Sequence, residues 1–170
     1  MAMEQTLVLI KPDGAKRKLT GLVIDRLDGA GLRLVAAKVV SVSEELARRH
    51  YRMLKDKPFF ENLIQYIRGK FHEIPDSQIL ALVYEGEGAI ARVRQAAGAT
   101  NPEEAAPGTI RGSFGRVTTK GQFENVVHAS GNAEDAEFEV KLWFTPAEVL
   151  HPIYPVTRGN GTKAEAAAWS

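Results

Sequence analysis

His128 is the residue of this sequence with the widest choice of chemistry. It follows two valines near the end of an apolar run, where a predicted strand meets a loop. A histidine in such a place can act as a nucleophile, a general base or a metal ligand, or it can be a satisfied core residue. No metal-ligand spacing connects the other histidines, so we expect no protein-held metal and assign no chemistry to His50, His72 and His151.

Several cationic and hydroxyl side chains could bind phosphate. Arginine offers a planar fork of donors that suits phosphate oxygens, and threonine adds a hydroxyl. Such residues lie in or just before one long loop, at Arg94, Thr100 and Arg111. Lys11 stands at the mouth of an apolar strand, against the turn Pro12–Gly14, where a lysine often reaches a bound anion. Taken one at a time, each is more often a solvated surface charge.

The elements that must position these residues alternate between strand-like and helix-like segments. Short runs rich in apolar and β-branched residues predict strands over 5–11, 32–42, 78–84 and 123–130. Apolar residues at helical spacing predict helices over about 19–30, 43–54, 58–67, 86–97 and 133–143. The order reduces to β-α-β-β-α-β with extra helices, which is typical of an α+β, ferredoxin-like fold with a four-stranded antiparallel sheet.

Two stretches show no clear periodicity. Residues 68–77 read as a loop, and residues 98–119 form a long segment with several glycines and prolines. A loop of that length in a compact domain is usually functional or disordered. We therefore expect residues 98–119 to be an active-site loop.

Composition limits the classes of function. The chain has 170 residues, enough for one domain, and its net charge of +1 argues against a nucleic-acid coat or an anionic-membrane binder. The absence of cysteine excludes a disulfide, a thiolate nucleophile and a cysteine-ligated metal. No apolar run could span a bilayer, and the first residues lack a signal-peptide pattern, so we expect a cytoplasmic protein.

Common phosphate-binding motifs are missing. The sequence contains no G-x-x-x-x-G-K-[ST] loop, no G-x-G-x-x-G after a strand and no protein-kinase catalytic loop. Phosphate chemistry in this chain must therefore use another scaffold.

Such a scaffold is indicated by a resemblance to the nucleoside diphosphate kinase family. Its motifs are N-V-V-H-A-S at Asn125–Ser130, T-L-V-L-I-K-P-D-G at Thr6–Gly14, K-P-F-F at Lys57–Phe60, G-A-T-N-P at Gly98–Pro102 and P-G-T-I-R-G at Pro107–Gly112. Several separated motifs in one order are highly specific. The resemblance runs from about residue 4 to residue 148, so we predict a kinase domain over 1–150 and a tail over 151–170.

The resemblance implies a Mg²⁺-dependent, ping-pong transfer of the γ-phosphate from ATP or another nucleoside triphosphate to a nucleoside diphosphate. His128 would be the nucleophile, Glu139 would orient its ring, and Ser130 would hydrogen-bond near the transferring phosphate. Asn125 would contact the ribose, and Phe59 and Leu63 would pack on the base. Phosphates and sugar would be held by Lys11, Tyr51, Arg94, Thr100 and Arg111. Mg²⁺ would be bound mainly by the nucleotide phosphates.

These implied roles are physically coherent. Phosphoryl transfer needs positioning and neutralisation of spread negative charge. A neutral imidazole is a competent nucleophile near neutral pH, and a carboxylate partner fixes its tautomer. Stacking uses the π-face of a base and no hydrogen-bonding edge, so it tolerates any base.

The sequence departs from the family in four places. Gly131 and Asn132 follow the H-x-S segment where an aspartate is usual, so a negative charge is lost there although a helix cap can survive. Residues 68–77 are longer than usual, which we interpret as a surface variation away from the motifs. Residues 116–124 carry a short insertion, which leaves Val117 as the candidate that closes over the base. The tail after Leu150 matches poorly.

The departures keep a second hypothesis open, a catalytically impaired nucleotide-binding or scaffold protein on the same fold. Against it, the sequence keeps His128, Glu139 and Arg111, which such a protein would be free to lose. The resemblance also implies a homo-oligomer, a tetramer or a hexamer. Nothing in the sequence indicates a membrane or nucleic-acid partner.

Overall fold

A four-stranded antiparallel sheet forms the centre of the computed structural model, which describes residues 2–157 and 168–170. The strand order is β2 (Arg33–Ser41), β3 (Gln78–Glu87), β1 (Met3–Ile10) and β6 (Val127–Ala129). Neighbouring strands all pair antiparallel. The β-α-β-β-α-β order and the fold class expected from the sequence are confirmed.

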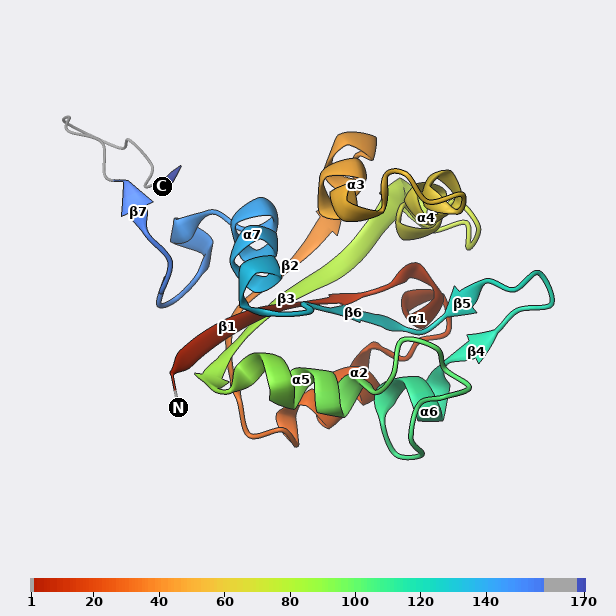
Figure 1. The fold of residues 1–170 in the computed structure, drawn as a ribbon, viewed down its shortest axis with the longest axis horizontal. Helices are drawn as coiled ribbons and strands as arrows, with labels where there is room; N and C mark the ends of the chain where they lie inside the picture. Colours follow the sequence, from red (N-terminus) through yellow and green to blue (C-terminus); the bar gives the residue numbers. More distant parts are fainter. Residues whose placement is uncertain (1, 158–167) are drawn as a thin grey trace.

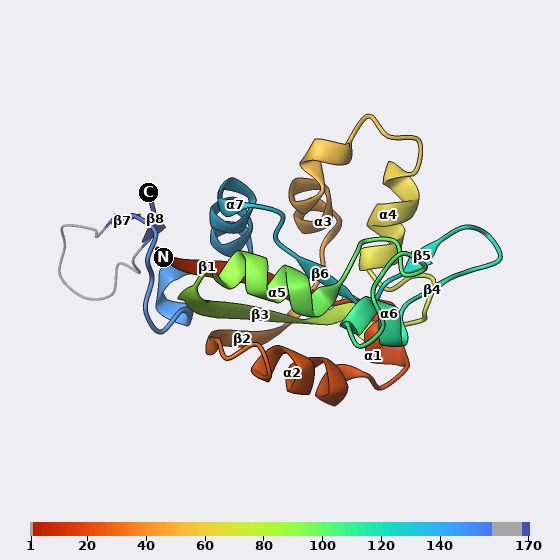
Figure 2. The same cartoon turned by 60° about the horizontal axis from the view of Figure 1, so that its bottom comes forward.

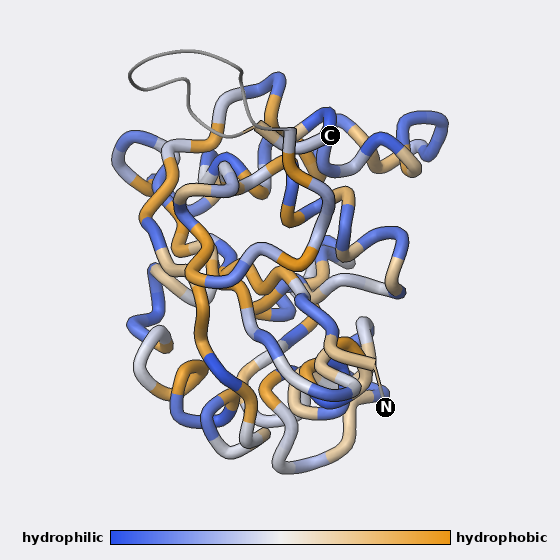
Figure 3. Tube along the Cα trace, turned by 90° about the vertical axis from the view of Figure 1, so that its left-hand side faces the viewer, coloured by the Kyte–Doolittle hydropathy of each residue, from blue (hydrophilic) through white to orange (hydrophobic). Residues whose placement is uncertain are grey.

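Helices cover both faces of this sheet (Figure 1). One face packs against α3 (Glu44–His50), α4 (Phe60–Ile67) and α7 (Ala133–Trp143). The other packs against α2 (Thr20–Asp28), α5 (Ala89–Ala97) and α6 (Ile110–Phe114). Because side chains of a strand alternate between faces, Leu7 and Leu9 enter the first core and Val8 and Ile10 the second. Figure 3 shows the apolar stretches running through the interior and the polar ones gathering at peripheral turns.

The remaining elements are short. They are α1 (Pro12–Lys16), the 3₁₀ turns η1 (Arg52–Leu54), η2 (Pro75–Ser77) and η3 (Pro146–Glu148), and the two-stranded pairs β4 (Arg116–Val117) with β5 (Phe123–Glu124) and β7 (Val156–Thr157) with β8 (Ala168–Trp169). Figure 2 shows the β4–β5 hairpin projecting beside α4, at the opposite end of the molecule from the two termini. Residues 158–167 of the predicted tail lie outside the described residues.

Several predicted boundaries were wrong. The strand predicted over 123–130 is broken into β5 and β6, because Val126 has a left-handed backbone with φ of 69°. The helix predicted over 43–54 ends at His50 and continues only as η1, and β3 extends to Glu87, into the helix predicted from residue 86. The long loop over 98–119 contains α6 and β4, and α1 was not expected.

Candidate active site

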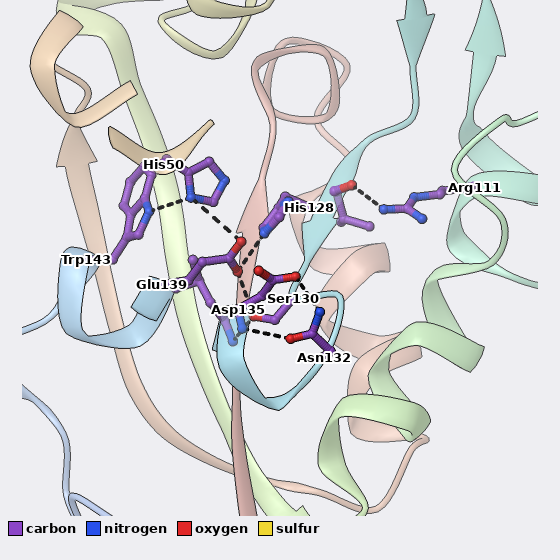
Figure 4. Close-up of polar contacts among 10 residues, drawn as sticks. His50, Arg111, His128, Ser130, Asn132, Asp135, Glu139 and Trp143 are labelled. Carbon is purple, nitrogen blue, oxygen red and sulfur yellow. Dashed lines mark hydrogen bonds and ion pairs between the residues drawn. The ribbon is translucent and has the colours of Figure 1, made fainter. Parts of the chain in front are cut away.

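His128 lies in the middle of β6, paired with Leu9 of β1, and its side chain is partly exposed. Its Nε2 lies 2.8 Å from Oε2 of Glu139 on α7, and the Ser130 hydroxyl donates to the same carboxylate oxygen at 2.7 Å (Figure 4). A carboxylate only accepts hydrogen bonds, so this contact assigns the His128 proton to Nε2. Nδ1 is left with its lone pair, so it is the ring nitrogen that is able to act as a nucleophile.

The start of α7 is built to hold Glu139 in place. Asn132 caps the helix by accepting a hydrogen bond from the backbone N–H of Asp135 at 2.9 Å. Glu134 and Asp135 in the first turn match the positive end of the helix dipole. The helix cap therefore forms with a glycine at position 131. Glu139 itself is only 7% exposed, so its two hydrogen bonds are sheltered from water.

The backbone before His128 is strained and firmly held. Val126 is β-branched and buried, yet it has a positive φ, a conformation that is rare for such residues. Its carbonyl accepts from the Lys11 N–H at 2.8 Å, and its N–H donates to the Asp13 carboxylate at 2.9 Å. Asp13 is fully buried and also accepts from the Tyr66 hydroxyl. These bonds fix the turn that places Asn125 and His128 on the same side of the sheet edge.

A chain of polar contacts runs from Lys11 into the long loop. The Lys11 ammonium donates to Oδ1 of Asn125 at 2.7 Å, and Nδ2 of Asn125 donates to the Thr100 carbonyl at 2.8 Å. Burial, the largest effect, lowers the pKa of Lys11 to about 8, although the nearby Asp13 carboxylate opposes the shift. Lys11 is therefore a buried cation that no carboxylate of the described residues bonds, a state that favours an incoming anion.

Arg111 is the second buried cation. Its guanidinium donates to the Gly98 carbonyl at 2.8 Å and to the Val127 carbonyl at 3.0 Å, while its buried Nε has no partner among the described residues. Burial and the charge of Arg94 lower the pKa of Arg111 to about 10, so it stays protonated at neutral pH. The α5–α6 loop thus forms around Arg111 and orients it toward β6.

One cavity of about 700 Å³ joins these groups. The residues to which the resemblance gave catalytic or nucleotide-binding roles all line it except Ser130, which is fully buried and bonded to Glu139. The lining set is Lys11, Tyr51, Phe59, Leu63, Arg94, Thr100, Arg111, Asn125, His128 and Glu139. Cations and hydroxyls share this cavity with an aromatic wall, so it fits a ligand that has both phosphates and a flat ring.

The part of the cavity wall that the β4–β5 hairpin forms differs from the prediction. Val117 does not line the cavity; Lys120, Gly121, Gln122 and Phe123 of the β4–β5 hairpin do. Gly121 has φ of 74°, which lets the hairpin turn and directs the following strand, with Phe123, back along the cavity. The hairpin thus contributes an aromatic residue to the cavity.

The segment 68–77 also differs from expectation. It is not remote from the site, because His72 lies 2.8 Å from the carboxylate of Glu124 on β5, and Arg116 of β4 donates to the same carboxylate at 2.5 Å. The His72 ring also contacts Tyr66, which lines the cavity. The longer segment therefore supports the hairpin that borders the cavity.

His50 was missed altogether. It lines the cavity, and its ring contacts His128 edge to face with centroids 4.4 Å apart. His50, His128 and Glu139 lie close enough to surround a metal ion. We assign none, because Trp143 already donates to Nδ1 of His50 and His128 is bonded to Glu139. No local sequence signal points to His50, since the contacts come from three separate elements.

Gly131 is explained by its surroundings. A Cβ at this position would lie 2.8 Å from the Asp135 carboxylate, which is itself held by the Asn132 amide at 2.9 Å. Gly131→Asp is therefore expected to lower the free energy of unfolding by about 1 kcal/mol, because two carboxylates would compete for one space. Thermal denaturation measures the effect. Adding Asp135→Asn should recover most of the loss, and an equal loss with and without it would contradict this explanation.

Comparisons with known proteins agree on one family. The family model described as Nucleoside diphosphate kinase matches residues 4–149. A nucleoside diphosphate kinase of Symbiobacterium thermophilum is 48% identical over 146 residues, which cover 86% of this chain and 90% of the relative. One from Thermus thermophilus is 43% identical over 148 residues, which cover 87% of this chain and 100% of the relative.

Solved structures agree as well. A transition state mimic of the nucleoside diphosphate kinase of Borrelia burgdorferi, with bound vanadate and ADP, superposes with a TM-score of 0.77 at 37% identity, over 88% of this chain and 92% of that one. The enzyme of Halobacterium salinarum in complex with CDP gives a TM-score of 0.77 at 38% identity, over 88% and 93%.

Proposed function

Because this chain belongs to the nucleoside diphosphate kinase family, we propose that it moves the γ-phosphate of a nucleoside triphosphate to a nucleoside diphosphate through a phosphohistidine on His128. One observation carries the proposal. Glu139 holds the proton on Nε2 of His128, so the lone pair of Nδ1 is available beside a cavity lined by Lys11, Arg94 and Arg111. A nucleophilic nitrogen therefore lies beside the cations that the phosphates of the substrate require.

In the first half-reaction, the Nδ1 lone pair attacks the γ-phosphorus while the bond from that phosphorus to the bridging oxygen breaks. The nucleoside diphosphate leaves with the bridging electrons. The imidazole becomes positive as the N–P bond forms, and the Glu139 carboxylate balances that charge. In the second half-reaction a terminal oxygen of another nucleoside diphosphate takes the phosphoryl group, and His128 returns to its neutral state.

The other cavity residues bind the nucleotide. We assign the phosphates to Lys11, Arg94 and Arg111 and the hydroxyl contacts to Tyr51 and Thr100. Asn125 would contact the ribose, and its side-chain oxygen accepts a hydrogen bond from Lys11. Phe59 is half exposed and stands with Leu63 at the cavity wall, which suits stacking on any base. Ser130 acts through Glu139, because its hydroxyl is bonded to that carboxylate.

Mg²⁺ would be held chiefly by the phosphates. The acidic residues that line the cavity are Glu139 and Asp135, and both are engaged, with His128 and Asn132 respectively. The remaining charged lining residues are cationic, so this donor set suits phosphate oxygens better than a metal ion. When bound, the ion would neutralise charge on the phosphates of the substrate.

The test is a two-step labelling experiment. The protein is incubated with Mg²⁺ and ATP labelled on its γ-phosphate, free nucleotide is removed, and unlabelled GDP is added. We expect acid-labile, base-stable label on the protein, followed by labelled GTP. If the protein binds nucleotide but neither retains nor transfers the label, the catalytically impaired alternative would be favoured. No contact among the described residues of the cavity supports that alternative.

We also propose a homo-oligomer, a tetramer or a hexamer, and a cytoplasmic location, where nucleoside triphosphates are the available substrates. Native mass spectrometry decides the assembly, and a monomer at micromolar concentration would contradict it. No helix among the described residues is long and apolar enough to cross a membrane.

Lys11 predicts a specific pH dependence. With its pKa lowered to about 8, this side chain loses its charge above that pH in the free protein, so kcat/KM is expected to fall on the alkaline side. Bound phosphates favour the charged form, so kcat at saturation should hold to higher pH. Lys11→Arg should remove the alkaline fall, because a guanidinium stays protonated. A kcat/KM profile that stays flat well above pH 8 in the unsubstituted protein would contradict this role.

A further inference from the structure

His50 and Trp143 form a hydrogen-bonded pair behind the nucleophile. The indole N–H of Trp143 lies 3.1 Å from Nδ1 of His50, and both side chains are buried. An indole nitrogen can only donate, so Nδ1 of His50 must be the acceptor. This excludes the Nδ1–H tautomer and the doubly protonated ring. His50 is therefore neutral, with its proton on Nε2.

The excluded states of His50 are the ones that would disturb Glu139. Nδ1 of His50 also lies 4.0 Å from Oε1 of Glu139, with no hydrogen bond because both atoms are acceptors (Figure 4). A proton on Nδ1 would turn this contact into an attraction after a small rotation of either side chain. Glu139 would then be drawn from His128, to which its other oxygen is bonded at 2.8 Å.

We propose that Trp143 and His50 form a tautomer lock, which reserves the Glu139 carboxylate for His128 and Ser130. Both are positioning residues, because neither is assigned a contact with the reacting atoms. The role rests on the function proposed for His128. The proposal adds one requirement to the pair of His128 and Glu139: the neighbouring His50 ring must be prevented from competing with His128 for the Glu139 carboxylate.

Two further observations support the lock. Nε2 of His50 is buried and has no partner among the described residues, although the lock places a proton there. An unpaired buried donor is unfavourable by about 1–3 kcal/mol. The surroundings of Nε2 therefore do not favour a proton there, and the Nε2–H tautomer of His50 must be imposed by the hydrogen bond from Trp143 to Nδ1. Burial, followed by the proximity of the His128 ring and the positive charges of Lys11 and Arg52, also lowers the pKa of His50, which keeps the ring neutral.

The tautomer can be measured directly in the unsubstituted protein. Nitrogen-15 NMR of histidine-labelled protein distinguishes Nδ1–H, Nε2–H and charged rings, and His50→Asn assigns the His50 signals. We expect His50 as Nε2–H at neutral pH. A His50 found as Nδ1–H or as a cation overturns the proposal whether or not the protein transfers phosphate, so this result is independent of the proposed function.

Trp143→Phe removes the donor and keeps an aromatic ring in the core. We expect His50 to shift to Nδ1–H and kcat to fall roughly tenfold to a hundredfold, the usual effect of losing a partner that orients a reactive group. KM for nucleotides should change little. The matched control is Trp169→Phe, because Trp169 also donates from its indole N–H, to the Phe144 carbonyl at 2.6 Å, and is the only other tryptophan. It should leave kcat unchanged.

A double substitution separates competition from general loosening of the core. His50→Phe removes both ring nitrogens, so adding Trp143→Phe to it should lower kcat no further. An equal loss of kcat from Trp143→Phe in the presence and absence of His50, or an unchanged tautomer in Trp143→Phe, would overturn the lock. Absence of transfer in every protein, including the unsubstituted one, would instead count against the proposed function.

Discussion

Replacing His128 with alanine is expected to abolish phosphate transfer and leave nucleotide binding largely intact. Alanine has no lone pair to form the N–P bond, while the cations and aromatic residues that line the rest of the cavity are untouched. Loss of a covalent nucleophile lowers turnover by a factor of at least about 10⁴. Steady-state transfer from ATP to GDP and retention of label on the protein both measure it, and calorimetry measures ADP binding.

His151→Ala is the matched control for this experiment. His151 is exposed, lies outside the cavity and contacts Arg33, so its loss should leave both transfer and labelling unchanged. Robust transfer by His128→Ala would mean that another group carries the phosphate. Loss of ADP binding together with transfer would show that the substitution had damaged the cavity, and the assignment of His128 as the nucleophile would then lose its support.

Glu139→Gln should give the second largest loss. Glutamine keeps the size of the side chain but brings an amide in place of a carboxylate, so it cannot balance the positive charge that develops on His128. Its NH₂ group can also face Nε2, which favours the wrong tautomer of the imidazole. We expect kcat to fall by a factor of about 10²–10⁴, as when the carboxylate partner of a catalytic histidine becomes an amide. Single-turnover labelling isolates the step.

The matched control is Glu137→Gln on the same helix. Glu137 pairs with Lys141 at the surface, so its loss should affect helix stability slightly and transfer not at all. If Glu139→Gln transferred phosphate as fast as the unsubstituted protein, Glu139 would be a structural residue and the tautomer lock would have nothing to protect.

The sheet could be predicted from sequence because its signal is local. Leu7 to Ile10 are all fully buried, and a short apolar run bounded by Pro12 and Gly14 indicates such a strand. The cap at Asn132 could be anticipated for the same reason, since an asparagine accepts from the backbone of the first turn. The cluster of cavity residues came from the ordered motifs of the family, not from periodicity.

The rest depends on contacts that no window of sequence contains. Val126 has a positive φ, and the groups that hold its backbone belong to Asp13 and Lys11, from the start of the chain. The role inferred for His50 depends on its contacts with Trp143 and Glu139, which lie on α7, far along the sequence. Phe123 lines the cavity and Val117 does not, although the two residues pair directly across the hairpin, so the position of the hairpin in the fold and not its local pairing decides which one borders the cavity.

The central place of β1 has a consequence for synthesis of the chain. β1 is made first, yet it lies between β3 and β6, and β6 is the last strand of the sheet to be made. Until β6 emerges from the ribosome, one edge of β1 carries unpaired backbone groups beside apolar side chains, a template for wrong pairing. His128, the proposed nucleophile, lies on β6, the strand that closes this edge. A nascent chain should therefore gain nucleotide binding only at the moment when its most aggregation-prone edge disappears.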